Sequence, residues 1–126
     1  NYLCFKSNHI PEMSMADQIG LAAKKGNELA RNAARLMMEI FATSIANNIL
    51  VTGSQKCVII CGGISAKLSN FFSDSEFFER LSNKGKYKNY VSDVPILLSF
   101  DDNNGLKGSA EAFYNPFFQS QKLRKI

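Results

Sequence analysis

Two adjacent glycines, Gly62 and Gly63, directly follow the apolar stretch CVIIC at residues 57–61. A helix-like pattern comes next, so the pair marks a strand-to-helix corner. Glycine has no Cβ, and a flat ligand or a phosphate can therefore approach the main chain there. Open α/β sheets bind ligands at the carboxyl ends of their parallel strands, beside the amides that begin a helix. The pair is neither a Walker loop nor a G-x-G-x-x-G fingerprint, so a tight turn or close helix packing explains it as well.

The cysteines and the histidine do not form a recognisable site. Cys57 and Cys61 lie four residues apart on the expected strand, which separates their backbones by about 13 Å. This is too far for a disulfide. The chain has three cysteines and one histidine, His9. We therefore expect no zinc site and interpret both strand cysteines as small buried residues.

Length and composition indicate one soluble, globular domain. The 126 residues are 45% hydrophobic and 21% charged. No apolar run reaches the roughly 18 residues of a membrane helix, and no signal-peptide pattern is present, so we expect a cytoplasmic protein. The net charge is +4, but the basic residues are spread along the chain. We expect neither a nucleic acid nor a membrane as partner.

Helical patterns fill most of the remaining sequence. The longest is apolar around more than half of its circumference and must be largely buried. A capping-box pattern, Ser73 with Glu76, is expected to open the short helix in SEFFERLSN. The other expected helices cover about Met15–Lys24, Glu28–Leu50, Ser65–Phe72 and Leu106–Tyr114, and KGKYKNYV is expected to be a turn or short helix.

Two strands, Cys57–Cys61 and Val94–Phe100, are apolar on both faces and are separated by more than thirty mostly helical residues. This arrangement predicts a parallel sheet buried between helices. A stable open sheet usually has about four to six strands. Either the chain pairs with another polypeptide, or it is a piece of a larger α/β domain.

Four motifs extend this interpretation: CVIICGGI at 57–64, FF at 71–72, KGKYKNYVSDVPILL at 84–98 and DDNNGLKGSAEAF at 101–113. In order and spacing they resemble the C-terminal part of bacterial-type glucokinases, in the hexokinase and actin-like ATPase superfamily. The long helix and the loop around Pro11 fit with weaker identity. The resemblance implies an α/β fold, the C-terminal part of an actin-like ATPase (ribonuclease H-like) large lobe with parallel strands packed between helices.

The resemblance also implies a nucleotide site. In that superfamily the glycine pair lies against the ribose and adenine of ATP, which assigns cofactor-binding roles to Gly62, Gly63 and Ile64. Lys67 stands where relatives often carry a basic residue and joins this set. For its side chain, a phosphate contact and a solvated helix lysine both remain open.

The closing segment is interpreted as structural. In GLKGSA, residues 105–110, the resemblance implies a helix that packs closely on the sheet through Gly108 and Ala110. Asn103 or Asn104 is the expected N-cap. The neighbouring carboxylates Asp101 and Asp102 have no identifiable partner, so we interpret them as solvated or capping rather than as an acid–base pair.

Other motifs of the family do not occur in this sequence. They are the Asp-x-Gly-Gly-Thr phosphate loop, the Asn-Asp pair with the catalytic base, and the later Glu-x-x-His and Glu that bind sugar hydroxyls. We therefore expect residues 1–126 to be a C-terminal fragment of the glucokinase large domain, with residues 115–126 a flexible tail. Catalytic, sugar-binding and most magnesium-binding residues are expected upstream of Asn1.

The resemblance thus implies that the parent protein transfers a phosphoryl group from Mg-ATP to the 6-hydroxyl of glucose, the first step of glycolysis. The isolated segment is expected to be inactive, and a homodimer remains open. One alternative is a non-catalytic nucleotide-sensing or interaction module of the same architecture. That module should unfold cooperatively by itself, whereas an incomplete lobe should aggregate or lack fixed packing. Another alternative is a kinase for a related hexose.

Overall fold

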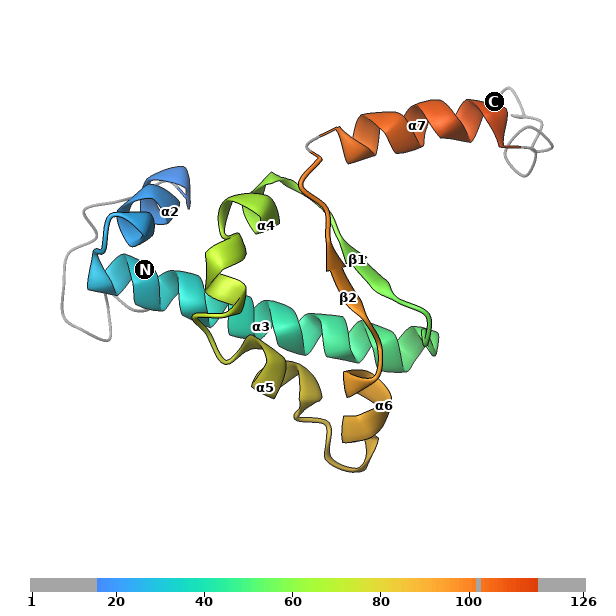
Figure 1. Cartoon of the computed structure of the whole chain (residues 1–126), viewed down its shortest axis with the longest axis horizontal. Helices are drawn as coiled ribbons and strands as arrows, with labels where there is room; N and C mark the ends of the chain where they lie inside the picture. Colours follow the sequence, from blue (N-terminus) through green and yellow to red (C-terminus); the bar gives the residue numbers. More distant parts are fainter. Residues whose placement is uncertain (1–15, 102, 116–126) are drawn as a thin grey trace, which may run out of the picture.

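The computed structural model describes residues 16–101 and 103–115, without the side chains of Ala16 and Ser65. A long central helix carries the other elements, and a small sheet lies beside it (Figure 1). The predictions on His9, on the loop around Pro11, on Asp102 and on residues 116–126 of the expected tail lie outside the described residues. The elements are α2 (Ala16–Lys24), α3 (Glu28–Thr52), β1 (Val58–Ile60), α4 (Gly63–Lys67), α5 (Phe77–Ser82), α6 (Lys88–Ser92), β2 (Ile96–Leu98) and α7 (Asn104–Tyr114), with 3₁₀ turns at Ser69–Phe72 and Gly85–Tyr87.

Helix α3 begins and ends at residues suited to those positions. Asn27 is its N-cap, and the Asn27 side chain accepts a hydrogen bond from the Ala30 amide at 3.0 Å. Gly53 closes the helix in the left-handed conformation, with φ 66°. The expected helix from Glu28 to about Leu50 is therefore confirmed, and it continues to Thr52.

The buried side of α3 is narrower than the sequence indicated. Small side chains predominate there, whereas Met37 is 40% and Ile40 is 60% exposed. The expectation of burial around more than half of the helix is wrong for the described structure, because its neighbours cover only one side. The buried residues of α3 are Ala30, Ala34, Met38, Ala42, Ile45, Ala46 and Ile49.

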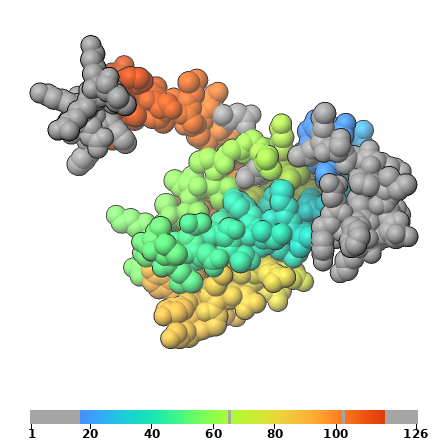
Figure 2. Space-filling model, turned by 180° about the vertical axis from the view of Figure 1, so that it is seen from behind, coloured from blue at the N-terminus to red at the C-terminus, as the bar shows by residue number. Residues whose placement is uncertain are grey.

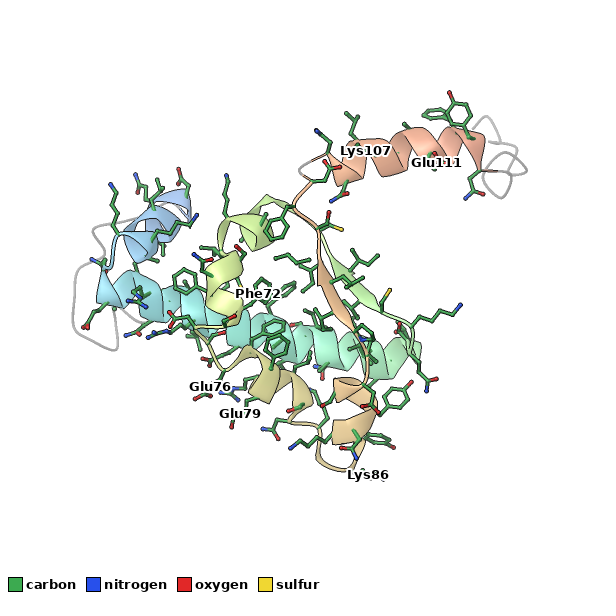
Figure 3. The ribbon with its side chains drawn as sticks, in the orientation of Figure 1. Phe72, Glu76, Glu79, Lys86, Lys107 and Glu111 are labelled. Atoms are coloured by element: carbon green, nitrogen blue, oxygen red, sulfur yellow. The ribbon has the colours of Figure 1, made fainter. Side chains whose placement is uncertain are left out.

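Helices α2 and α5 and the first 3₁₀ turn pack on this side of α3. Phe77 of α5 has no exposed surface, and its ring meets that of Phe72 edge-on with centroids 4.8 Å apart. Figure 3 labels Phe72 above α3. Aromatic rings that cover a stripe of alanines allow close approach of the helices, which is how a small core reaches high packing density.

The sheet is parallel, as predicted, and consists of two strands among the described residues. Ile59 of β1 pairs with Leu97 of β2. Hydrogen bonds close both ends of the pairing, from the Val58 amide to the Pro95 carbonyl and from the Ser99 amide to the Ile60 carbonyl, each at 2.9 Å. Both strands are three residues long and thus shorter than expected.

One face of this sheet lacks a covering layer among the described residues. Ile60 is buried against the core, whereas Ile59 is 60% and Leu97 is 51% exposed. The expectation that both faces are buried is therefore wrong for this part of the chain. Parallel sheets normally have both faces covered.

The expected capping box of α5 does not form. Glu76, not Ser73, occupies the N-cap position, and its side chain makes no capping hydrogen bond. The preceding loop is instead held by Asp74, whose carboxylate pairs with Arg35 at 2.9 Å and with Arg31 at 3.0 Å. These hydrogen bonds, led by that from Arg35, lower the pKa of Asp74 below its ordinary value.

Helix α7 extends away from the rest of the chain (Figure 1). Asn103 is its N-cap residue, as predicted, although its side chain makes no capping bond. No atom lies within 4 Å of a Cβ built on Gly108, and Ala110 is exposed. The expectation that this helix packs closely on the sheet is therefore wrong for the described residues. Figure 3 shows Lys107 and Glu111 on α7, remote from the core. No helix among residues 16–101 and 103–115 has the length and apolar character needed to cross a membrane.

Truncation of Phe77 tests the core. Phe77→Ala removes a fully buried ring that packs edge-on against Phe72, and should lower the free energy of unfolding in urea by about 3–5 kcal/mol. The neighbouring Phe78 is 58% exposed, so Phe78→Ala should change this free energy by less than about 1 kcal/mol. Equal losses in the two variants would contradict the described core.

The Asp74 pairings predict a pH dependence. Because the pKa of Asp74 is lowered in the folded state, its contribution is complete above the ordinary carboxyl pKa and is lost as the pH falls through the lowered value. Asp74→Asn should therefore lower the Tm at pH 7, and in circular-dichroism melts the difference from wild type should shrink as the pH falls below the ordinary carboxyl range. Asp93→Asn, at an exposed aspartate outside this cluster, is the control. A Tm difference independent of pH would refute the assignment.

Candidate functional site

The corner after β1 has the backbone geometry that the glycine pair suggested. Gly62 has φ 116° and ψ 152°, a conformation that other residues adopt only with strain. No atom lies within 4 Å of a Cβ built on it. The main chain at Gly62 is therefore bare on its outer side, and Gly62 occupies the N-cap position of α4. Close packing against a neighbour does not explain this glycine in the described structure.

The helix that follows is shorter than predicted. It runs from Gly63 to Lys67, and a 3₁₀ turn over Ser69–Phe72 replaces the remainder of the expected helix from Ser65 to Phe72. The change at Leu68 places both Leu68 and Phe71 in the core. A five-residue helix has a small dipole, so the corner offers a bare surface for close approach rather than a strong field for phosphate.

The other two predicted site residues lie on α4. Ile64 lies in the first turn of α4, and its side chain is 62% exposed. Lys67, in the last turn, is exposed and has no ion pair among the described residues. Gly62, Gly63, Ile64 and Lys67 thus follow one another around a single exposed corner.

The carboxyl end of β2 lies at the same end of the sheet, where the chain turns into α7 (Figure 1). A hydrogen-bond network shapes this turn. Asn104 donates from its side chain to the Ser99 hydroxyl and to the Asp101 carbonyl, both at 2.7 Å. The Asp101 carboxylate accepts from the Asn103 amide at 2.9 Å and pairs with Lys107.

Asp101 therefore has partners that the sequence did not reveal. Its carboxylate accepts a hydrogen bond from the amide two residues on, which forms a turn before α7 and does not cap the helix. The expectation that Asp101 has no identifiable partner is wrong, since Lys107 in the first turn of α7 pairs with it. The spacing of six residues across a loop gave no periodic signal for this pair. The Lys107 hydrogen bond, followed by that from Asn103, lowers the pKa of Asp101.

The thiols near the corner are free. Cys61 is exposed and Cys57 is partly exposed, so their interpretation as small buried residues is wrong, because they flank a strand with one open face. No group of three or more His, Cys, Asp or Glu side chains suited to a metal occurs among the described residues. A pocket of about 310 Å³ lies elsewhere, lined by Glu79, Ser82, Asn83, Gly85 and Lys88.

The described residues at this edge can therefore bind but offer no arrangement for proton transfer or nucleophilic attack. The corner presents bare main chain, an exposed apolar side chain at Ile64 and an exposed cation at Lys67. Such a surface suits a flat, partly apolar ligand that carries negative charge at one end.

Comparison with known proteins agrees with the resemblance seen in the sequence. The glucokinase family model matches residues 1–116. A glucokinase from Hahella chejuensis is 30% identical over 114 residues, 90% of this chain and 35% of that protein. One from Chromohalobacter salexigens is 32% identical over 94 residues, 75% of this chain and 30% of that protein. One from Escherichia fergusonii is 38% identical over 79 residues, 63% of this chain and 25% of that protein.

The chain spans about one third of the length of the relatives that match it along most of its residues. The family model, in contrast, covers nearly the whole chain. The chain therefore belongs to the glucokinase family.

Proposed function

We propose that the complete polypeptide carrying this chain is an ATP-dependent glucokinase, and that this segment supplies the adenosine side of its nucleotide site. The observation that carries the proposal is the bare main chain at Gly62, which precedes Gly63 at the carboxyl end of a parallel strand. The family match supports it. In this proposal the chain forms the C-terminal part of an actin-like ATPase large lobe.

The corner suits an adenosine for steric reasons. A purine and its ribose are flat, and they can lie against main chain only where no Cβ intervenes. Gly62 provides this surface, and the exposed side chain of Ile64 provides apolar contact area beside it. Lys67 is the nearest candidate for a charge contact with the phosphates, one α-helical turn further along.

The role in catalysis is positioning. In phosphoryl transfer the protein mainly aligns the reactants and stabilises charge, so the location of the nucleotide affects the rate directly. The catalytic base, the sugar ligands and most of the magnesium site would come from the remainder of the polypeptide. The 126-residue chain alone should not phosphorylate glucose. The physiological reaction would be the first step of cytoplasmic glycolysis.

Two alternatives remain to be separated by experiment. A non-catalytic nucleotide-sensing or interaction module would bind nucleotide without any kinase activity in the complete polypeptide. A kinase for a related hexose would have a higher kcat/KM for that sugar than for glucose. The glucokinase proposal requires activity with glucose that exceeds activity with mannose, fructose and amino sugars.

Substitution at the corner tests the nucleotide role. In the complete polypeptide, Gly63→Val places a branched side chain where the nucleoside would lie, and Gly62→Ala strains the backbone by about 1–3 kcal/mol. We expect the KM for ATP to rise about tenfold in either variant. The KM for glucose should change little, as measured by coupled assay with one substrate varied at a time.

Gly85→Ala is the matched control for Gly62→Ala. Gly85 also has a positive φ, of 54°, and open surroundings, but it lies in the turn before α6. Its replacement should leave both KM values unchanged. Unaltered ATP kinetics in the Gly63→Val enzyme would remove the nucleotide role from this corner.

Lys67 has a separate test. If its ammonium group contacts the phosphates, Lys67→Met should raise the KM for ATP up to about fivefold, the range of an exposed ion pair. The effect should diminish in high salt. Lys86→Met, at an exposed lysine near Tyr87, should have no effect on ATP kinetics. An unchanged KM in Lys67→Met would identify Lys67 as a solvated helix residue.

A further inference from the structure

A pocket of about 310 Å³ opens beside the turn that joins α5 to α6, and we call it the α5–α6 pocket. In Figure 1 and Figure 2 this part of the chain lies below α3, whereas α4 lies above it. The pocket is therefore separate from the proposed nucleotide site. It contains no apolar side chain and is lined by Glu79, Ser82, Asn83, Gly85 and Lys88.

Packing against the core holds the walls of the α5–α6 pocket in place. Leu81 of α5 and Val91 of α6 are 4% and 0% exposed, and both belong to the core cluster. The turn between the helices is tied to α3 by Lys84, whose ammonium group donates to the Asn47 side chain at 2.6 Å. The pocket is thus formed by the fold itself, and a ligand would not have to order a loop in order to bind.

Two opposite charges line the pocket without pairing with each other. The Glu79 carboxylate and the Lys88 ammonium group have no ion pair within the described part of the chain. Figure 3 labels Glu79 on α5 and Lys86 at the turn beyond it. Both charged groups of the pocket are therefore available to a ligand, and hydrogen bonds to charged groups are stronger than those between neutral groups.

The neutral groups of the pocket add hydrogen-bonding capacity. The Ser82 hydroxyl donates to the Glu79 carbonyl at 3.1 Å, so its oxygen remains free to accept a hydrogen bond from a ligand. The Asn83 side chain is exposed and offers one carbonyl and one amino group. Together with the Glu79 carboxylate, these groups present mainly acceptors. Hydroxyl groups on a ligand would be suitable donors to them.

Size and charge narrow the class of ligand. Ligand pockets usually range from about 300 to 1,000 Å³, so this pocket suits a metabolite smaller than a nucleotide. The turn and the start of α6 carry three lysines, at positions 84, 86 and 88, and the pocket lining contributes one carboxylate. This excess of positive charge favours an anion over a neutral sugar or a zwitterion. A phosphate group carries between one and two negative charges near pH 7 and has three strong acceptor oxygens.

We propose that the α5–α6 pocket binds a small phosphate ester with free hydroxyl groups, such as a phosphorylated triose or hexose. Its phosphate would contact Lys88, and its hydroxyl groups would donate to the Glu79 carboxylate and the Ser82 oxygen. The proposal does not depend on kinase activity or on the glycine corner. The pocket is open to water and contributes one ammonium group directly, so we expect a Kd of about 1 mM.

Glycerol 3-phosphate is the probe for this site in the complete polypeptide, because it is not a product of the proposed kinase reaction. At constant ionic strength, about 20 mM of the probe should raise the Tm by about 2–4 °C. The dependence of Tm on its concentration gives the Kd. Inorganic phosphate and glycerol each provide half of the proposed contacts, so each should bind at least about fivefold more weakly.

Substitutions in the pocket locate the bound probe. Lys88→Met should raise the Kd for glycerol 3-phosphate about three- to fivefold, the range of an exposed ion pair. Glu79→Ala removes an acceptor for the hydroxyl groups, so it should abolish most of the preference for glycerol 3-phosphate over inorganic phosphate. Both side chains are exposed, so folding should be retained in circular-dichroism spectra.

Two matched substitutions serve as controls. Lys25→Met and Glu111→Ala replace an exposed lysine and an exposed glutamate outside the pocket. Both variants should keep the Kd and the preference of the wild type.

The outcomes are distinct. A Kd that rises in Lys88→Met but not in Lys25→Met, with the preference lost in Glu79→Ala, supports the proposal. Binding that is unchanged in Lys88→Met lies elsewhere and overturns it. Equal affinity of the wild type for inorganic phosphate and glycerol 3-phosphate shows a simple anion contact and also overturns it. An unchanged Tm at about 20 mM probe, some twenty times the expected Kd, has the same consequence.

Discussion

The structure depends on contact between one helix and its neighbours through a stripe of alanines. Ala30, Ala34, Ala42 and Ala46 are at most 4% exposed, and α2, α5 and the first 3₁₀ turn lie against this side of α3. Packed helices approach each other more closely through alanine than through leucine, since little side-chain volume lies between the backbones. Phe77 then fills the space that remains. The Arg31 and Arg35 pairings with Asp74 fix the loop that leads to it.

This one-sided core determines where the glycine corner can lie. The sheet contacts the core through alternate side chains such as Ile60, and this orients the strand so that its carboxyl end emerges at the surface. Gly62 then turns the chain with a φ that other residues rarely adopt, and Leu68 and Phe71 return it to the core. The corner is joined to the core through Leu68 and Phe71 and is bare on its outer side at Gly62, as the proposed nucleoside site would require.

Sequence patterns predicted the elements that have strong local signals. The capped helix α3, the parallel pairing of β1 with β2 and the N-cap at Asn103 are all present. The errors have a common physical origin. Apolar side chains such as Ile40 and Ile59 indicate burial, but the partner that would bury them need not be in the same segment. A local pattern therefore indicates that a face can be buried, but it does not identify the element that buries it.

The candidate site was predicted in part for the same reason. A glycine pair after an apolar strand is visible in the sequence, and it predicted the corner at Gly62 and Gly63. The turn after β2 was not predicted in detail, because the partners of Asp101 and Ser99 follow from the direction in which α7 leaves the sheet. Ser73 does not cap α5, because the helix begins later, at Phe77, and Asp74 in the intervening loop is bound by two arginines of α3.

The pairing of β1 with β2 has a further consequence for handling of the protein. Each strand of a two-stranded sheet forms backbone hydrogen bonds along one edge. Its other edge offers unpaired amide and carbonyl groups to any extended chain. Residues 57–61, CVIIC, contain no charge, proline or glycine and have high β propensity. Lys56 and Pro95 adjoin the two strands, where a charge and an imino acid act as gatekeepers against self-association of such segments. Replacement of either residue would remove one of these gatekeepers and favour association through the open strand edges.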